Sequence, residues 1–89
     1  MTKYGWKITC DFEECRAAGT MGPRSMSDDI RGQLNAGAGR IQRLYDDDGN
    51  PYFEARLIGG DGFEVLDNYG EAFGCTEVRE LIDGVWNTL

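Results

Sequence analysis

The sequence predicts an α+β fold, namely an antiparallel, mostly meandering β-sheet of five or six strands with one short α-helix. The 89 residues are enough for one hydrophobic core and too few for two, so a single domain over residues 1–89 is expected. Several short runs alternate apolar with polar residues, which is the pattern of half-buried strands. Asp48-Gly49 and Asp83-Gly84 separate such runs, and this dipeptide favours tight hairpins.

The first expected strand covers residues 6–12. Trp6, Ile8 and Cys10 alternate with polar residues there, so these three side chains are expected to share one apolar face. Residues 17–27 are rich in glycine, serine, threonine and proline, and neither strand nor helix periodicity runs through them. This segment is therefore expected to be a loop.

A short helix is expected over residues 28–36. Ser27 is a favourable N-cap, and Asp28 and Asp29 would place negative charge in the first turn, where the helix dipole favours it. The interior of this helix has few apolar residues and contains a glycine. Packing against the sheet, more than intrinsic propensity, is expected to stabilise it.

The rest of the chain reads as strands joined by tight turns. The expected strands cover residues 41–45, 52–58, 63–66, 75–82 and 85–89. Asp-Gly pairs lie in the first and last of the intervening turns, so each of these turns is expected to close a hairpin.

Aromatic residues fall into two groups. Those expected in the core at strand positions are Trp6, Phe53, Phe63 and Trp86. Those that flank acidic turns are Tyr45, Tyr52 and Tyr69. Tyrosine is enriched at binding hot spots, but partial burial in a structural role is the favoured interpretation of the second group.

The composition argues against catalysis. The chain contains no histidine, which excludes nucleophile systems that need an imidazole base and the His-Glu-x-x-His zinc helix. A glycosidase carboxylate pair needs a cleft, for which a chain of this length with short loops has little room. We therefore expect no enzymatic activity and no cofactor.

Three cysteines, Cys10, Cys15 and Cys75, are expected to be free thiols. The polar N-terminal residues do not resemble a signal peptide, and no apolar run approaches a membrane span, so a cytoplasmic location is expected. A zinc site built from the three thiolates and a carboxylate is the alternative, but it lacks the usual two-residue spacing.

The net charge of -7 argues against direct nucleic-acid binding and against an anionic membrane surface. Residues 44–89 hold only two cations, Arg56 and Arg79, against eleven acids. Such a segment would attract a protein with a basic nucleic-acid groove, although acidity for solubility alone is the plainer interpretation. The candidate partner-binding residues are Asp46, Asp47, Asp48, Glu54, Asp61, Glu64, Asp67, Tyr69 and Glu71.

The three consecutive aspartates at residues 46–48 admit three interpretations: a solvated turn, a weak calcium site, or a surface for a cationic partner. Their spacing does not fit an EF-hand loop. The loop over residues 19–27 has some ingredients of a phosphate cradle, but Asp28 and Asp29 would repel a phosphate there.

Motifs spread over nearly the whole chain resemble those of small uncharacterised proteins of bacteriophages and mobile elements. The motifs are Gly-Thr-Met-Gly-Pro-Arg at residues 19–24, Tyr-Asp-Asp-Asp-Gly at 45–49, Gly-Cys-Thr-Glu at 74–77 and Trp-Asn-Thr-Leu at 86–89. Phe73 departs from the group, where a small polar residue is commoner. The resemblance implies a phage or mobile-element accessory gene and transfers no activity.

These observations together lead to a functional hypothesis. Small acidic proteins from such genes often occupy the nucleic-acid groove of a host defence complex, and anti-CRISPR proteins are similar in size and charge. The expected partner is a host protein or ribonucleoprotein with a basic groove. The alternative is a structural or assembly module of the phage or element, in which the acidity is incidental.

Overall fold

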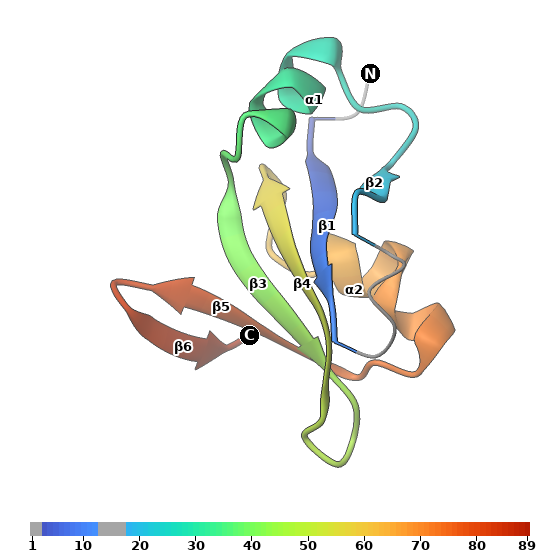
Figure 1. Ribbon diagram of the computed structural model, residues 1–89, viewed down its shortest axis with the longest axis vertical. Coiled ribbons are helices and arrows are strands. Elements are labelled where there is room, and N and C mark those ends of the chain that lie inside the picture. Colours follow the sequence, from blue (N-terminus) through green and yellow to red (C-terminus); the bar gives the residue numbers. More distant parts are fainter. Residues whose placement is uncertain (1–2, 13–17) are drawn as a thin grey trace.

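The computed structural model describes residues 3–12 and 18–89 and contains one six-stranded antiparallel sheet (Figure 1). The strands are β1 (Gly5–Asp11), β2 (Met21–Gly22), β3 (Arg40–Tyr45), β4 (Pro51–Ile58), β5 (Glu77–Ile82) and β6 (Val85–Thr88). The helices are α1 (Asp28–Asn35), α2 (Glu64–Asn68) and the short 3-10 helix η1 (Gly70–Phe73). The predicted α+β class with an antiparallel sheet is confirmed.

The strand order is β2-β1-β4-β3-β5-β6. Both predicted Asp-Gly hairpins are present, one joining β3 to β4 and the other joining β5 to β6. In the second turn Asp83 has a φ of 51°, in the left-handed region that Asp and Asn tolerate best among non-glycine residues. Strand β1 lies beside β4, and β5 lies beside β3, so the first hairpin occupies the centre of the sheet.

The main hydrophobic core lies between one face of the sheet and the layer formed by α2 and η1. Its buried residues come from β1, β3, β4, β5, α2 and the segment after η1; they are Trp6, Ile8, Leu44, Phe53, Ala55, Leu57, Val65, Leu66, Cys75 and Val78. Successive strand residues point to opposite faces, so the side chains between these positions lie on the other face. We call that second face the open face.

Helix α1 packs over one end of the open face, while α2 lies behind the sheet (Figure 1). Gly5 allows the close approach, because a Cβ at this position would collide with Ile30 and Met26. Lys7, also on the open face, donates a hydrogen bond from Nζ to Oδ1 of Asn35 at 3.4 Å. Elsewhere on the open face, no described helix covers the strands.

The predicted short helix is confirmed as α1. Ser27 caps it, because its hydroxyl oxygen accepts a hydrogen bond from the Ile30 N–H at 3.2 Å. Leu34 is the buried residue of this helix, so packing at one position holds it to the sheet. In the part of the chain that the structure describes, no helix has the length and apolar character needed to cross a membrane.

The strand predicted over residues 63–66 is wrong, because these residues enter and begin α2. A short apolar run does not distinguish a buried strand from one helical turn. Glu64 favours the helix here, because its carboxylate accepts hydrogen bonds from the N–H groups of Asp61 and Gly62 and so fixes the turn that leads into α2. Val65 and Leu66 are then buried against the sheet.

The face predicted for Cys10 is also wrong. The β1–β4 pairing is irregular between Ile8 and Cys10, and Cys10 then lies opposite Glu54. Because a bulge adds one residue to the strand, it reverses the faces that follow. Cys10 therefore lies on the open face, whereas Asp11 lies opposite Phe53 and is buried.

Two of the four aromatic side chains predicted in the core lie elsewhere. Trp6 and Phe53 are buried as expected, but Phe63 is 40% exposed. Trp86 lies opposite Leu81 on the open face and is half-buried. For Trp86 the edge position of β6 explains this result, since β6 has a neighbouring strand on one side only among the described strands.

Candidate functional site

The three aspartates of the β3–β4 turn have different roles. The Oδ1 atom of Asp46 accepts hydrogen bonds from the N–H groups of Asp48 at 2.9 Å and Asn50 at 2.8 Å. These bonds, chiefly the one from Asn50, lower the pKa of Asp46 below its usual value. Asp46 is therefore part of the turn itself, whereas Asp47 and Asp48 are exposed.

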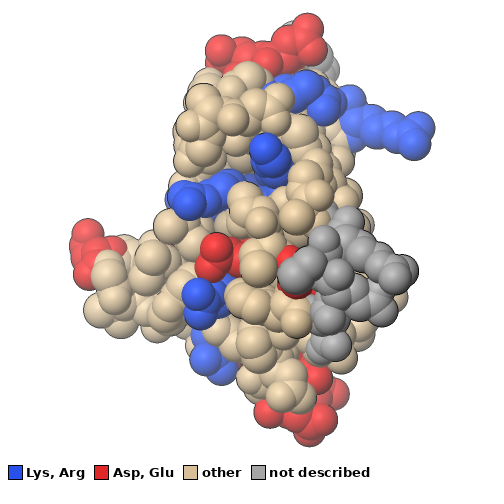
Figure 2. Space-filling view, in the orientation of Figure 1, with Lys and Arg blue, Asp and Glu red and all other residues tan. Residues whose placement is uncertain are grey.

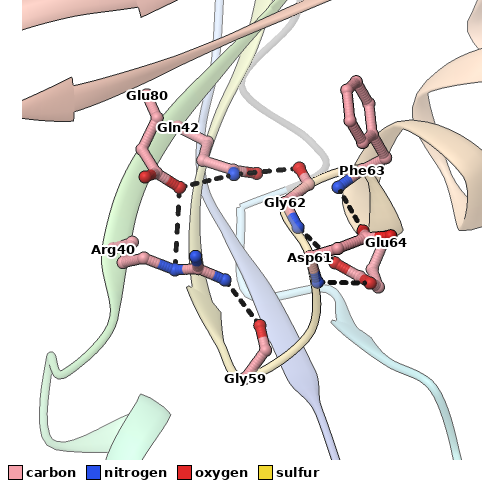
Figure 3. A network of polar contacts seen from close by, with 8 residues as sticks. All are labelled: Arg40, Gln42, Gly59, Asp61, Gly62, Phe63, Glu64 and Glu80. Carbon is pink, nitrogen blue, oxygen red and sulfur yellow. Dashed lines mark hydrogen bonds and ion pairs between the residues drawn. The ribbon is translucent and has the colours of Figure 1, made fainter. Parts of the chain in front are cut away.

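The loop between β4 and α2 uses two further predicted site residues internally (Figure 3). The Glu64 carboxylate accepts hydrogen bonds from the N–H groups of Asp61 and Gly62, both at 2.9 Å. Oδ1 of Asp61 accepts one from the Phe63 N–H at 3.2 Å, and this bond is the main cause of its lowered pKa. Both carboxylates therefore stabilise the loop.

A buried polar network ties this loop to β3 and β5 (Figure 3). Nε2 of Gln42 donates hydrogen bonds to the Gly62 carbonyl oxygen at 3.0 Å and to Glu80 Oε1 at 2.9 Å. Arg40 donates to the Gly59 carbonyl oxygen at 2.6 Å, and its Nε lies 3.6 Å from Glu80 Oε1. The network fixes the start of α2 relative to the sheet.

A groove of about 440 Å³ lies beside α2. It is lined by the β3–β4 turn, α2 and the segment before it, and the last two strands, through Asp46, Asp47, Phe63, Leu66, Thr76, Glu77, Val78, Thr88 and Leu89. Leu66 and Val78 give it a buried apolar floor, and Phe63 and Leu89 add exposed apolar walls. The exposed carboxylate of Asp47 beside these apolar side chains suits a cationic side chain with an aliphatic stem, whereas Asp46 is bonded within its turn and Glu77 pairs with Arg79. We call this feature the acidic groove.

The remaining predicted site residues are dispersed. Glu54 lies on the open face and accepts a hydrogen bond from Arg43 Nε at 3.0 Å. The Tyr69 ring packs on the core. Asp67 and Glu71 are exposed on α2 and η1. Of the nine predicted residues, the structure therefore brings only Asp46 and Asp47 into the acidic groove.

The open face carries residues that the sequence analysis did not select. Arg43 lies between two aromatic rings, with its guanidinium carbon 4.5 Å from the centre of the Trp86 ring and 5.5 Å from that of Phe12. Arg79 lies 4.1 Å from the centre of the Tyr45 ring and pairs with Glu77 through Nε. The sequence already indicated this placement, because Arg43 and Arg79 occupy polar positions in strands that alternate polar with apolar residues.

Charge is separated between the two layers of the molecule. Figure 2 shows Lys and Arg across the middle of the view and Asp and Glu mainly over α1 and the two hairpin turns. Behind the sheet, residues 59–76 include α2 and η1 and contain four acids and no cation, although Arg40 of β3 reaches this layer at Gly59. The acidic groove thus borders an acidic layer, and the cations of the second half of the chain lie on the open face.

The described cysteines do not form a shared site. Cys10 lies on the open face and Cys75 in the core, whereas Cys15 lies outside the described residues. Burial raises the pKa of the Cys75 thiol to about 11. Among residues 3–12 and 18–89, no three cysteine or acidic side chains are placed to hold a metal ion together.

No family model, curated protein or solved structure matches this chain. Any functional conclusion therefore depends on its own residues. Two surfaces combine charge with apolar or aromatic groups: the acidic groove beside α2 and the cationic part of the open face.

Proposed function

We propose that this chain is a phage or mobile-element protein that binds a basic surface of a host nucleic-acid-binding defence complex and inhibits it without catalysis. The acidic groove is the observation that carries this proposal. It places the exposed carboxylate of Asp47 beside Leu66 and Phe63, so a lysine or arginine side chain can bury its stem and pair its charge.

The acidic layer beside the groove supports the same function. Residues 59–76 contain four acids and no cation, which steers a basic partner towards this side of the molecule. Phe63 is 40% exposed at the groove, and aromatic side chains are enriched in the cores of protein interfaces. Lys and Arg line the nucleic-acid grooves of such host complexes, which makes them complementary in charge.

Affinity capture from a host lysate, followed by measurement with the captured protein, tests this proposal. We expect Asp47→Asn to weaken binding about fivefold, since losing one interfacial charge pair costs roughly 1 kcal/mol. Asp83→Asn is the matched control, because it removes the same charge from the β5–β6 turn and asparagine tolerates the positive φ there. Equal affinities of the two variants would contradict the proposal.

A structural or assembly module remains the second candidate function, and the edge strand β6 is the observation that favours it. Ile82 is 45% and Val85 60% exposed beside this edge, which offers apolar area and unpaired backbone groups to another strand. The dependence of binding on ionic strength distinguishes the two functions. Binding through the acidic groove weakens steeply as ionic strength rises, whereas self-association through β6, measured by sedimentation, does not.

A further inference from the structure

Like charges face each other on the open face. Arg43 lies directly opposite Arg79 across the β3–β5 pair, and Lys7 lies directly opposite Arg56 across the β1–β4 pair. Directly opposed like charges destabilise an antiparallel sheet. Glu54 and Glu77 offset part of this repulsion at Arg43 and Arg79, and a bound polyanion would relieve the rest.

Among the described residues, the open-face strand positions carry four cations and two carboxylates, although the whole chain is acidic; they are Lys7, Arg43, Arg56 and Arg79 against Glu54 and Glu77. Glu54 and Glu77 are the carboxylates paired there, one with Arg43 and one with Arg79. Each arginine pairs with its carboxylate through Nε, and the Tyr45 side chain is a further hydrogen-bond partner of both. The side chains of both arginines are 36% exposed.

Planar groups lie among these cations. The rings of Trp86 and Phe12 flank the Arg43 guanidinium, and Phe12 is 42% exposed. Aromatic rings and guanidinium planes on a sheet surface are the groups on which unpaired nucleic-acid bases stack. An acidic peptide would pair with the cations but make no comparable use of the rings.

We propose that the open face binds a short stretch of single-stranded nucleic acid, with phosphates on Arg43 and Arg79 and bases stacked on Phe12 and Trp86. The acidic turns at the ends of the molecule limit the length of this stretch (Figure 2). A rigid duplex would run past the face towards those turns, whereas a flexible strand of a few nucleotides can end within it. This site shares Glu77 with the lining of the acidic groove, but it lies on the open face and does not depend on the function proposed for that groove.

Fluorescence anisotropy with a labelled oligothymidylate of about ten nucleotides tests the proposal. We expect the wild-type protein to bind at low salt. In a plot of log binding constant against log salt concentration, the double variant Arg43→Gln with Arg79→Gln should have a slope shallower by about 1.4, or roughly 0.7 for each phosphate whose arginine partner is removed. The matched control is Lys3→Gln with Arg24→Gln, which removes two exposed charges outside the open face. This control is expected to keep the wild-type slope.

A second variant that is expected to bind more tightly keeps the test valid if the arginine variant misfolds. Glu54→Gln with Glu77→Gln frees both guanidinium groups from their carboxylates, so we expect the oligonucleotide to bind about threefold more tightly or better. Damage to the fold cannot produce this result. Unchanged or weaker binding by this variant, in a protein with the wild-type circular-dichroism spectrum, would count against the proposal.

Three other results would overturn the proposal. The first is no binding of the oligonucleotide at about 100 μM wild-type protein, the weak end of non-specific nucleic-acid affinities. The second is an equal loss of binding in the arginine variant and its control. The third is competition by oligoglutamate as effective as that by unlabelled oligonucleotide at equal charge, which would assign the face to an acidic protein.

Discussion

Replacing Tyr69 with alanine will distinguish a core residue from an interface residue. Its ring centre lies 5.4 Å from that of Trp6, 5.2 Å from Phe53 and 4.8 Å from Phe73. Each such pair contributes about 0.5–1.5 kcal/mol beyond its buried area. Because Tyr69 is only half-buried, we expect a loss of about 2–3 kcal/mol, below the ~3–5 kcal/mol typical of a fully buried aromatic residue.

Urea unfolding followed by far-ultraviolet circular dichroism measures this loss. A domain of 89 residues has a free energy of unfolding of about 4–13 kcal/mol, so the variant should remain folded at low temperature. Its melting temperature should fall by roughly 10–20 °C. Tyr69→Phe keeps the ring and should change stability by less than about 0.5 kcal/mol. A loss below about 0.5 kcal/mol for Tyr69→Ala, or equal losses for both variants, would refute the core assignment.

Three further predictions concern the turn, the thiols and the glycines. The pKa of Asp46 is lowered in the folded state, so its contribution to stability is present above about pH 4 and is lost as the pH falls through the folded pKa. Asp46→Asn should therefore reduce the loss of unfolding free energy at acid pH, measured by urea unfolding followed by circular dichroism. With a pKa raised from 9.0 to about 11, Cys75 has about one hundredth of the ordinary thiolate, and peptide mapping should find Cys10 alkylated well before it. Gly70→Ala should destabilise by about 1–3 kcal/mol, because a Cβ there would meet three core side chains at 3.1–3.3 Å. Gly32→Ala has open space in the interior of α1 and should stabilise by about 0.5–1 kcal/mol in the same urea assay.

Local signals made much of the fold predictable. Ser27, Asp48-Gly49 and Asp83-Gly84 act within a few residues of themselves, so the first helix and both hairpins could be placed from sequence. The start of α2 could not, because a strand and a helical turn bury a short apolar run equally well. The irregularity after Ile8 depends on pairing with β4, which lies more than 40 residues further along the chain.

The candidate site was harder to predict because charge was counted along the chain. Such a count adds together the two faces of every strand, although successive residues point in opposite directions. Glu54 and Asp47 belong to the same acidic half of the chain, yet one lies on the open face and the other lines the acidic groove. Counting charges at alternate positions would have grouped Arg79 with Glu77 and separated both from Glu80.

The hairpin of β5 and β6 contacts the rest of the sheet through β3 alone, and all of β6 except the half-buried Trp86 is exposed. An element held on one side opens more readily than the central strands, so its amide hydrogens should exchange with solvent first. The two tryptophans lie on either side of this boundary, Trp6 in the core and Trp86 on the hairpin. The protein therefore contains one intrinsic fluorophore for global unfolding and another for the detachment of its last hairpin, and replacing either with phenylalanine isolates the signal of the other.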